Sequence, residues 1–133
     1  MNITVSSRKK SELIDITAAV QKAVQDSGFI SGLVHIFSMH TTAGITINEN
    51  ADPDVPLDII QALDKAVPWF DNYHHREGNS AAHVKTSLFG SSEIVAVDQG
   101  RLVLGTWQAV FFCEFDGPRK RTVRLTLIPG LPG

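Results

Sequence analysis

Cysteine is nearly absent from this sequence. Only Cys113 occurs among the 133 residues, so no disulfide can form within the chain. A chain without disulfides fits a reducing compartment, and we expect a cytoplasmic protein. Cys113 lies in the apolar run 110–113, which predicts a small buried side chain rather than a reactive thiol.

Long apolar runs and an excess of basic charge are also missing. No segment approaches the roughly 20 apolar residues that a membrane-crossing helix needs. The N-terminal segment is polar and has no apolar core of signal-peptide length. A net charge of −2 argues against a general nucleic-acid binder, which would carry a broad basic surface. We therefore expect a soluble protein that binds neither membranes nor nucleic acid.

The sequence does contain enough apolar material for one core. Hydrophobic residues make up 43% of the chain, and 133 residues is an ordinary length for one domain. There is no internal repeat, low-complexity tract or linker, so we expect a single domain over residues 1–133.

The apolar pattern predicts an α+β domain with about seven to eight mostly antiparallel strands and two to three helices. We expect a sandwich-like or partly open barrel arrangement. The predicted strands are residues 3–7, 12–16, 31–39, 44–48, 93–97, 101–104, 106–115 and 122–128. The predicted helices are residues 18–27, a segment from about Asp54 to Pro68, and residues 81–89.

Local signals predict how several elements begin, end and pair. The hydroxyl of Thr17 is expected to cap the first helix, and Gly28 to end it. Asp54 is expected to be the N-cap of the second helix, with Pro56 in its first turn. The first two strands are predicted to pair with each other through a turn at residues 6–10.

The densest group of chemically active side chains lies in residues 73–85, which hold three of the five histidines. In an extended segment, His75 and Glu77 fall on the same side. If the following segment is helical, Asn79 lies just before its first turn and His83 one turn further on. Imidazole, carboxylate and carboxamide groups bind metals, move protons and hold phosphates, so a site is predicted here.

The alternative interpretation is that these are ordinary polar loop histidines. No standard metal-binding spacing such as His-Glu-x-x-His is present. The clustering of His75 and His83 with Glu77 nevertheless favours a site. His74 is expected to face solvent, and His35, within an apolar strand, is expected to be a hydrogen-bonded structural residue.

A second polar block begins at His40, directly after a predicted buried strand. His40 is either a third metal ligand brought in from the strand end or a general acid or base. The alternative is a turn residue that hydrogen-bonds the backbone. Thr41 and Thr42, with the backbone at Gly44, are candidates for holding an anion.

The next strand ends in another polar group. Asn48, Glu49, Asn50 and Asp52 follow its apolar residues, and positions 48, 50 and 52 share a side if the chain stays extended. The alternative interpretation is a set of Asx turns followed by a helix cap. The basic candidates for binding a phosphate are Lys85, Arg119 and Arg121, and the alternative for them is a solvated surface.

Taken in order, these blocks resemble the YjbQ-like family. The matching blocks are residues 40–44, 48–55, 73–79, 83–85, 105–108 and 114–119. They cover essentially the whole chain, and no single motif carries the resemblance. The resemblance implies a compact α+β domain that assembles as a homotrimer, with the polar site near the subunit interfaces.

The resemblance also implies a weak, secondary thiamine-phosphate synthase activity. That reaction joins hydroxymethylpyrimidine diphosphate to thiazole phosphate and releases diphosphate. The implied metal ligands are His40, His75 and His83. The catalytic candidates are His40, Glu49, Asp52, Glu77 and Lys85. The candidates for binding the substrate are Thr41, Thr42, Asn48, Asn79, Trp107 and Arg119.

The residues are compatible with this chemistry. Loss of diphosphate needs charge neutralisation, either by a divalent metal ion such as zinc or magnesium or by Lys85 and Arg119. Trp107 and Tyr73 are available to stack on a pyrimidine, and Asn79 to hydrogen-bond it. Two other functions use the same residues: a metal-dependent hydrolase or phosphatase of a small metabolite, and a non-enzymatic trimeric protein that binds a metal or ligand.

Overall fold

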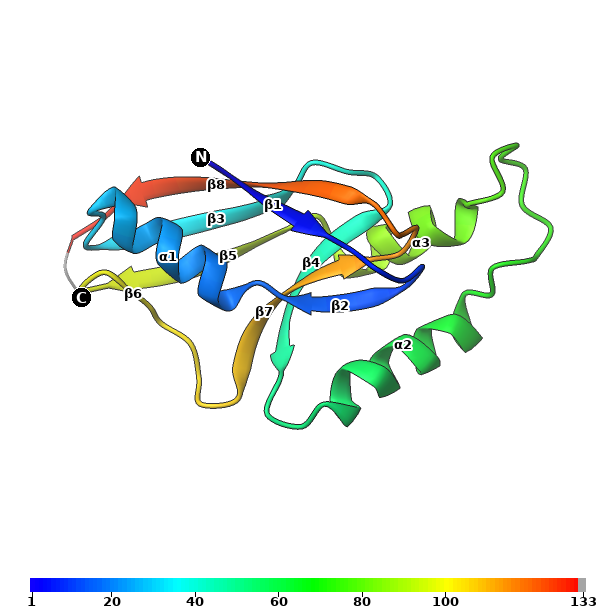
Figure 1. Cartoon of the computed structure of the whole chain (residues 1–133), viewed down its shortest axis with the longest axis horizontal. Helices are drawn as coiled ribbons and strands as arrows, with labels where there is room; N and C mark the ends of the chain where they lie inside the picture. The colour runs from blue at the N-terminus through cyan, green and yellow to red at the C-terminus, as the bar shows by residue number, and fades with distance from the viewer. Residues whose placement is uncertain (132–133) are drawn as a thin grey trace.

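The computed structural model describes residues 1–131, which contain eight strands and three helices joined by loops (Figure 1). One sheet has the order β1 (Asn2–Ser6), β8 (Lys120–Pro129), β3 (Gly32–Ser38), β5 (Ser92–Asp98) and β6 (Arg101–Leu102). The other has the order β2 (Glu12–Asp15), β7 (Gln108–Glu114) and β4 (Ala43–Glu49). Every strand pair is antiparallel. The expected α+β class is confirmed.

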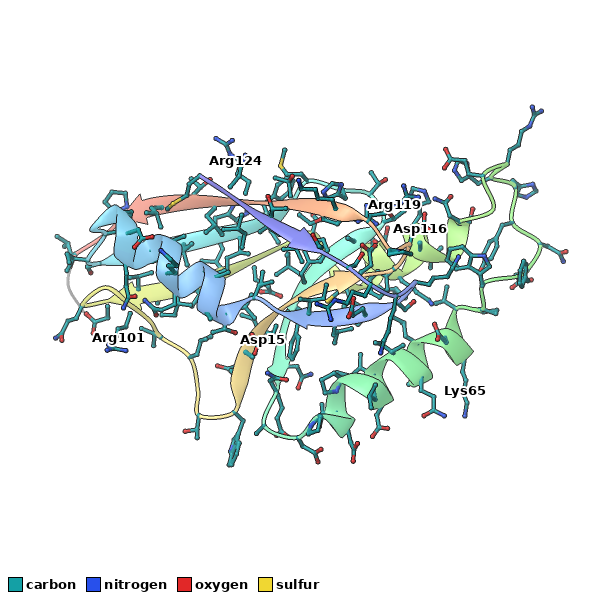
Figure 2. All side chains as sticks on the ribbon, viewed as in Figure 1. Asp15, Lys65, Arg101, Asp116, Arg119 and Arg124 are labelled. Atoms are coloured by element: carbon teal, nitrogen blue, oxygen red, sulfur yellow. The ribbon has the colours of Figure 1, made fainter. Side chains whose placement is uncertain are left out.

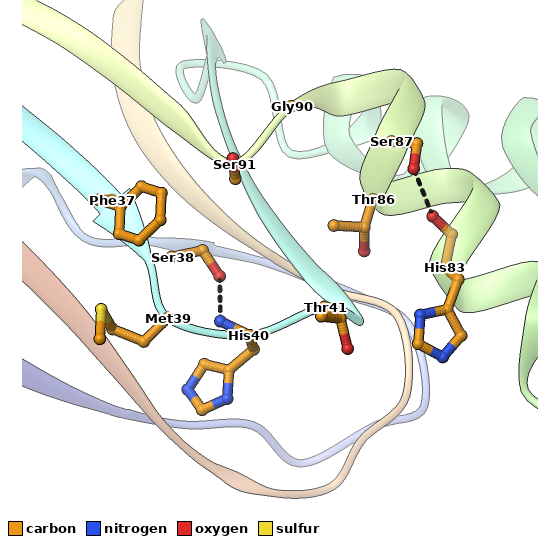
Figure 3. A pocket seen from close by; sticks show the side chains of 10 residues that line it. All are labelled: Phe37, Ser38, Met39, His40, Thr41, His83, Thr86, Ser87, Gly90 and Ser91. Carbon is orange, nitrogen blue, oxygen red and sulfur yellow. Dashed lines mark hydrogen bonds between the residues drawn. The ribbon is translucent and has the colours of Figure 1, made fainter.

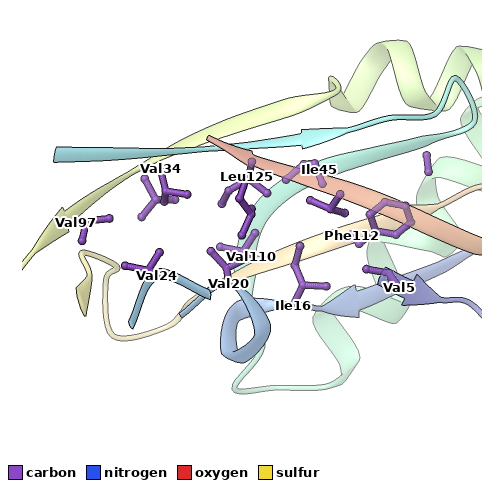
Figure 4. Packing of buried hydrophobic residues seen from close by; sticks show 14 residues of the cluster. Val5, Ile16, Val20, Val24, Val34, Ile45, Val97, Val110, Phe112 and Leu125 are labelled. Carbon is purple, nitrogen blue, oxygen red and sulfur yellow. The ribbon is translucent and has the colours of Figure 1, made fainter. Parts of the chain in front are cut away.

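The main core lies between the two sheets. Along β8, Val123 and Leu125 are buried while Arg124 between them is exposed, because successive side chains of a strand point to opposite faces. Helix α1 (Thr17–Ser27) closes this core with Val20 and Val24, which are fully buried (Figure 4). The alternation predicted for residues 122–128 is therefore confirmed.

Strand β7 is buried on both faces, which explains its continuous apolar run. Its second face carries Phe111 and Cys113, which pack in a separate cluster with Ala82 and Phe89 of α3 (Ser80–Phe89). Burial, followed by the nearby charge of Glu93, raises the pKa of the Cys113 thiol. The thiol thus stays protonated, and the expectation of a buried, unreactive cysteine is confirmed.

The predicted pairing of the first two strands is wrong. Strand β1 pairs with β8, with Ile3 opposite Val123, whereas β2 pairs with β7, with Leu13 opposite Cys113. The connection between β1 and β2 instead runs along the turn that joins β7 to β8, where the N–H of Ser7 donates to the carbonyl of Arg119. The alternation of apolar and polar residues predicted both strands correctly, but it carries no information on which strands they pair with.

Two predicted helix caps are also wrong. Thr17 is the first residue of α1, and its hydroxyl accepts a hydrogen bond from the N–H of Val110 (2.8 Å) instead of capping the helix. Asp54 begins α2 (Asp54–Ala66) and makes no side-chain cap; the carboxylate of Asp52 accepts the N–H of Asp54 (2.9 Å). Gly28 ends α1 with φ +74°, as predicted.

Within residues 1–131, none of the helices is long and apolar enough to cross a membrane.

Candidate functional site

Two neighbouring hollows lie where α3 passes the connection between β3 and β4. The first, of about 310 Å³, is lined by His75, Glu77, Asn79, His83 and Arg119, among others, and we call it the histidine hollow. The second, of about 690 Å³, is lined by Phe37, Met39, His40, Thr86 and Ser91, among others, and we call it the serine hollow. Thr41 and His83 line both, so the two hollows adjoin.

Side chains from one side of helix α3 line both hollows. Asn79, His83 and Thr86 are four and then three residues apart, a spacing that places side chains on one side of a helix. Figure 3 shows His83 and Thr86 extending from α3 on the side that faces Thr41. Asn79 directly precedes Ser80, the first residue of α3, so the N-terminal end of the helix borders the histidine hollow.

The side chains predicted to converge from residues 75–83 do line one hollow. The rings of His75 and His83 are perpendicular, with centroids 5.4 Å apart. The Nε2 atom of His75 lies 4.0 Å from Oε1 of Glu77. His74 is exposed, as predicted from its alternation with His75.

Asn79 is buried with half of its amide unused. Its side-chain N–H donates to Oδ2 of Asp116 (3.0 Å), while its Oδ1 has no hydrogen-bond partner although the residue is only 7% exposed. Buried polar atoms in proteins are nearly always paired, so an unpaired one in a hollow is a candidate position for a water molecule, an ion or a ligand. Oδ1 is an acceptor and suits an N–H or O–H donor or a cation.

A buried ion pair supports the floor of the histidine hollow. Glu114 has no exposed surface and accepts hydrogen bonds from Arg121 and from the Ser7 hydroxyl (2.6 Å). Burial alone raises the pKa of Glu114, but the bonds from Arg121 and Ser7 and from the Asp116 N–H outweigh it, so the pKa lies below its usual range. Arg121 also donates to the Thr42 hydroxyl (2.9 Å), which fixes Thr42 in the hollow.

Both guanidinium groups of the histidine hollow have carboxylate partners. Arg121 is balanced by Glu114, and Arg119 donates to Oδ2 of Asp116 (3.1 Å). Figure 2 shows Arg119 and Asp116 next to each other beside α3. Arg119 is 54% exposed and is the guanidinium open to a ligand. A highly charged anion bound here would therefore need an additional cation for neutralisation.

His40 has a defined structural partner. Its Nε2 accepts the N–H of Thr122 (2.8 Å), which ties the connection after β3 to β8. An accepting Nε2 carries no hydrogen, so the neutral ring carries its proton on Nδ1. Burial, followed by the charge of Arg121, lowers the pKa of His40. This matches the alternative of a residue that hydrogen-bonds the backbone, and Nδ1 is the nitrogen that remains available.

The three histidines are near one another but do not form a ready set of ligands in one chain. His83 lies between them, since it lines both hollows, while His40 lines only the serine hollow and His75 only the histidine hollow. Among the residues described, 1–131, no group of three or more His, Cys, Asp or Glu side chains is arranged to hold a metal ion.

Asn48, Glu49, Asp52 and Trp107 lie at the other end of β4 from Thr42. Asn48 lies six positions after Thr42, which corresponds to about 20 Å in an extended chain. In this second cluster the N–H of Asn50 donates to the carbonyl of Trp107 (3.4 Å), and Trp107 is 63% exposed. One chain therefore holds two separate groups of candidate residues.

Lys85 also lies outside both hollows. It is two residues from His83, which turns it to the opposite side of α3. Its Nζ lies 2.5 Å from Oδ1 of Asp64 in α2, and its side chain is only 2% exposed. Lys85 thus borders a third hollow, of about 440 Å³, with Asp64 and Trp69.

Sequence reasoning missed the residues that hold the site in place. Glu114, Asp116 and Ser7 organise the two arginines, yet none was a candidate. A signal was available in Glu114, which directly follows the buried apolar run ending at Cys113. Thr86 was also missed, although it continues the helical spacing from Asn79 and His83.

Comparison with known proteins gives consistent matches over the whole chain. The profile of the family described as "UPF0047 protein YjbQ-like" matches residues 1–130. The chain is 50% identical over 127 residues to the UPF0047 protein YugU of Bacillus subtilis, covering 95% of this chain and 96% of the relative. It is 48% identical over 124 residues to a UPF0047 protein of Methanocaldococcus jannaschii, covering 93% and 90%.

Solved structures match in the same way. A crystal structure of a YjbQ/UPF0047 family protein from Clostridium acetobutylicum has a TM-score of 0.94 at 51% identity, covering 96% of this chain and 99% of that chain. A conserved hypothetical protein from Thermus thermophilus has a TM-score of 0.90 at 40% identity, covering 96% and 99%. These names state no reaction, so a function has to be argued from the site.

Proposed function

Because the chain belongs to the UPF0047 family of YjbQ-like proteins, we propose that it is a weak transferase of the thiamine-phosphate synthase type. It would join hydroxymethylpyrimidine diphosphate to thiazole phosphate and release diphosphate. The observation that supports this best is the histidine hollow, where His75, His83 and Glu77 lie with the unpaired Oδ1 of Asn79 and the exposed guanidinium of Arg119.

In this reaction the two substrates react directly with each other, and no protein group has to form a covalent bond. The ring nitrogen of the thiazole bonds to the methylene carbon of the pyrimidine as the bond from that carbon to the diphosphate oxygen breaks. The electron pair of the broken bond leaves with diphosphate. The protein has to orient the two substrates and stabilise the negative charge on the leaving group.

Several groups of the histidine hollow suit a diphosphate. Arg119 offers a partly exposed guanidinium, and Thr41 and Thr42 offer hydroxyls. The first N–H groups of a helix have no partner within it, so the N-terminal end of α3 adds donors and a favourable dipole. These features favour an anion but leave most of the charge of a diphosphate uncompensated, because both arginines already have carboxylate partners.

The residues fit a divalent metal ion in donor chemistry. His75 and His83 offer imidazole nitrogen, and Glu77 offers a carboxylate, which are ligands of zinc and other divalent first-row metals. The unpaired Oδ1 of Asn79 is a further oxygen donor, of the kind that magnesium accepts. Zinc or magnesium held here would supply positive charge to the leaving diphosphate. His40 would join them as a ligand only by giving up its bond from the N–H of Thr122, because the neutral ring now carries its proton on Nδ1.

We propose that the protein is a homotrimer. The outer face of the larger sheet carries three exposed apolar side chains, Leu33, Ile94 and Ile128, in neighbouring strands. Leu33 lies opposite Ile128, and His35 opposite Ile94, so these side chains share one surface. A second copy covering apolar surface removes it from water. Association would also offer a way to bring the Asn48–Asp52 cluster of one copy toward the histidine hollow of another.

The test is product formation by the purified protein. It is supplied with hydroxymethylpyrimidine diphosphate, thiazole phosphate and either zinc or magnesium, and thiamine phosphate is measured by chromatography. We expect slow product formation that is lost in His83→Ala and kept in His74→Ala, which alters an exposed histidine nearby. Circular dichroism and size-exclusion chromatography establish that both variants fold and assemble.

Each other outcome is decisive. Absence of product with every metal overturns the transferase assignment. Release of phosphate or diphosphate without thiamine phosphate would instead identify a hydrolase. Bound metal without turnover would identify a binding protein. Equal loss of activity in His74→Ala and His83→Ala would show that the histidine hollow is not the site.

A further inference from the structure

Thr86 carries a buried hydroxyl that makes no hydrogen bond within the described residues 1–131. The residue is 7% exposed, and its Oγ1 has no hydrogen-bond partner. A helical threonine can hydrogen-bond the carbonyl three or four residues earlier, and Thr86 makes no such bond. Figure 3 shows Thr86 extending from α3 with its hydroxyl on the side of Thr41. Thr86 therefore lines the serine hollow with a hydroxyl whose donor and acceptor are both unused within the described chain.

The rest of the serine hollow suits a flat ring with a polar edge. Phe37 and Met39 supply apolar surface, and Met39 is 52% exposed and free to adjust. Methionine sulfur packs favourably against aromatic rings. A volume of about 690 Å³ falls within the range of small-molecule sites. Ser38 is not available to a ligand as a donor, because its hydroxyl donates to the carbonyl of Ala43 (2.7 Å).

The two hollows are joined by residues that belong to both. Thr41 and His83 line each of them, and α3 runs past both with Asn79 at one and Thr86 at the other. The two unpaired buried polar atoms, Oδ1 of Asn79 and Oγ1 of Thr86, thus lie on one helix face, seven residues apart. Seven residues of helix rise about 10 Å, so one extended ligand is long enough to reach both.

We infer that the serine hollow binds the ring of a phosphorylated nitrogen heteroaromatic compound whose phosphate lies in the histidine hollow, and that Thr86 recognises the ring. The hydroxyl of Thr86 would donate to a ring nitrogen or accept from an exocyclic amino group. His83 and Arg119 would contact the phosphate side, and Oδ1 of Asn79, an acceptor, would face a cation bound to the phosphate. This assignment rests on the proposed function and adds to it a subsite for the ring and a residue that determines specificity.

Binding of two probes separates the two hollows. Inorganic diphosphate fills only the histidine hollow, whereas hydroxymethylpyrimidine diphosphate fills both. Calorimetry with magnesium present measures each dissociation constant for the unaltered protein, for Thr86→Val and for Thr86→Ser. Valine keeps the shape of threonine without the hydroxyl, and serine keeps the hydroxyl.

We expect the pyrimidine compound to bind at least about 10-fold more tightly than diphosphate. Thr86→Val should weaken the pyrimidine compound about 5- to 10-fold, which is the range of one hydrogen bond, and leave diphosphate unchanged. Thr86→Ser should retain most of the affinity. Thr86→Val should also unfold at the same or a higher urea concentration, because it removes a buried hydroxyl without a partner.

The outcomes that overturn the inference differ from those that overturn the proposed function. If diphosphate binds but the pyrimidine adds no affinity, or if Thr86→Val leaves both affinities unchanged, the ring subsite is wrong and the phosphate site remains. If Thr86→Val weakens both probes equally, Thr86 does not recognise the ring. If diphosphate itself does not bind, both the ring subsite and the proposed function fail.

Discussion

The polar side chains of the site differ most in how completely their hydrogen bonds are satisfied. Glu114 accepts bonds from Arg121, from Ser7 and from the N–H of Asp116, so its charge is fully supported. Asn79 and Thr86, equally buried, each keep one atom unpaired. Fully paired buried groups serve to hold a structure, whereas unpaired ones cost stability unless a water molecule, an ion or a ligand supplies the missing partner.

His40 makes stability depend on pH at the scale of one residue. Its pKa in the folded protein lies below the ordinary value of 6.5, first because it is buried and then because Arg121 is near. As the pH falls through the ordinary value, the unfolded chain takes up a proton that folded His40 resists. The free energy of unfolding therefore decreases as the pH falls, until the folded pKa is passed.

We expect His40→Gln to flatten this dependence. The glutamine Oε1 can accept the N–H of Thr122 in place of Nε2, and it does not titrate. Urea unfolding at steps from about pH 7 to about pH 5 measures the free energy of unfolding of each protein. His74→Gln, at an exposed position, is the matched control and should follow the unaltered protein. An equally steep dependence in His40→Gln would contradict the assignment.

At the scale of elements, one glycine fixes how β4 passes α3 and β5. A Cβ atom on Gly44 would lie 2.6 Å from the carbonyl oxygen of Gly90, the residue after α3. The same oxygen accepts the N–H of Ile45 (3.1 Å). The absence of a side chain at position 44 therefore lets the start of β4 contact the end of α3, and this contact forms one side of the site.

We expect Gly44→Ala to destabilise the protein by about 1–3 kcal/mol, the range for a forced side chain in a packed position. Hydrogen exchange of the Ile45 N–H should become faster, because its acceptor is pushed away. Gly28→Ala is the matched control: Gly28 has φ +74°, but nothing lies within 4 Å of an added Cβ. It should lose about 1 kcal/mol without changing exchange at Ile45. Unchanged exchange in Gly44→Ala would refute the contact.

The elements themselves could be predicted from the sequence, and their partners could not. The alternation in residues 122–128 and the apolar runs at 31–39 and 106–115 reflect burial, which leaves a direct trace in composition. The pairing of β1 with β8 depends on contacts between residues about 120 positions apart in the sequence. The alternation of apolar and polar residues within a strand does not report such contacts. Caps failed at Thr17 for a similar reason, since its hydroxyl bonds to Val110 of β7 rather than to its own helix.

The residues of the site likewise fall into those that local sequence predicts and those that depend on distant contacts. Convergence of His75, Glu77, Asn79 and His83 followed from local spacing, because the loop and α3 are continuous in the sequence. The supporting partners Glu114 and Asp116 come from a distant turn, which no local pattern connects to them. Distance along β4 separates Asn48 and Glu49, at the end of the strand, from Thr42, which directly precedes it.

At the scale of the whole molecule, the outer face of the larger sheet is the proposed contact between copies. We expect Ile94→Arg to dissociate the trimer, because it places a charge among Leu33 and Ile128 on a surface that association would bury. Size-exclusion chromatography with light scattering measures the mass. We expect the mass of a monomer for this variant and of a trimer for the unaltered protein.

Leu57→Arg provides the control for this prediction. Leu57 is 59% exposed and Ile94 is 56% exposed, but Leu57 lies on α2, away from the sheet face. It should keep the trimeric mass. A monomeric Leu57→Arg variant together with a trimeric Ile94→Arg variant would move the interface to α2. A monomeric mass for the unaltered protein would remove the proposal altogether.

The burial of the single cysteine makes the protein suitable for thiol labelling at an introduced position. Cys113 has no exposed surface, and burial keeps its thiol protonated, so maleimide reagents should not reach it in the folded protein. A second cysteine introduced at the exposed position of His74 would then be the one reactive thiol of each copy. A spin label attached there would report distances between copies by pulsed electron paramagnetic resonance. The protein can thus be labelled at a chosen site without removal of its native cysteine.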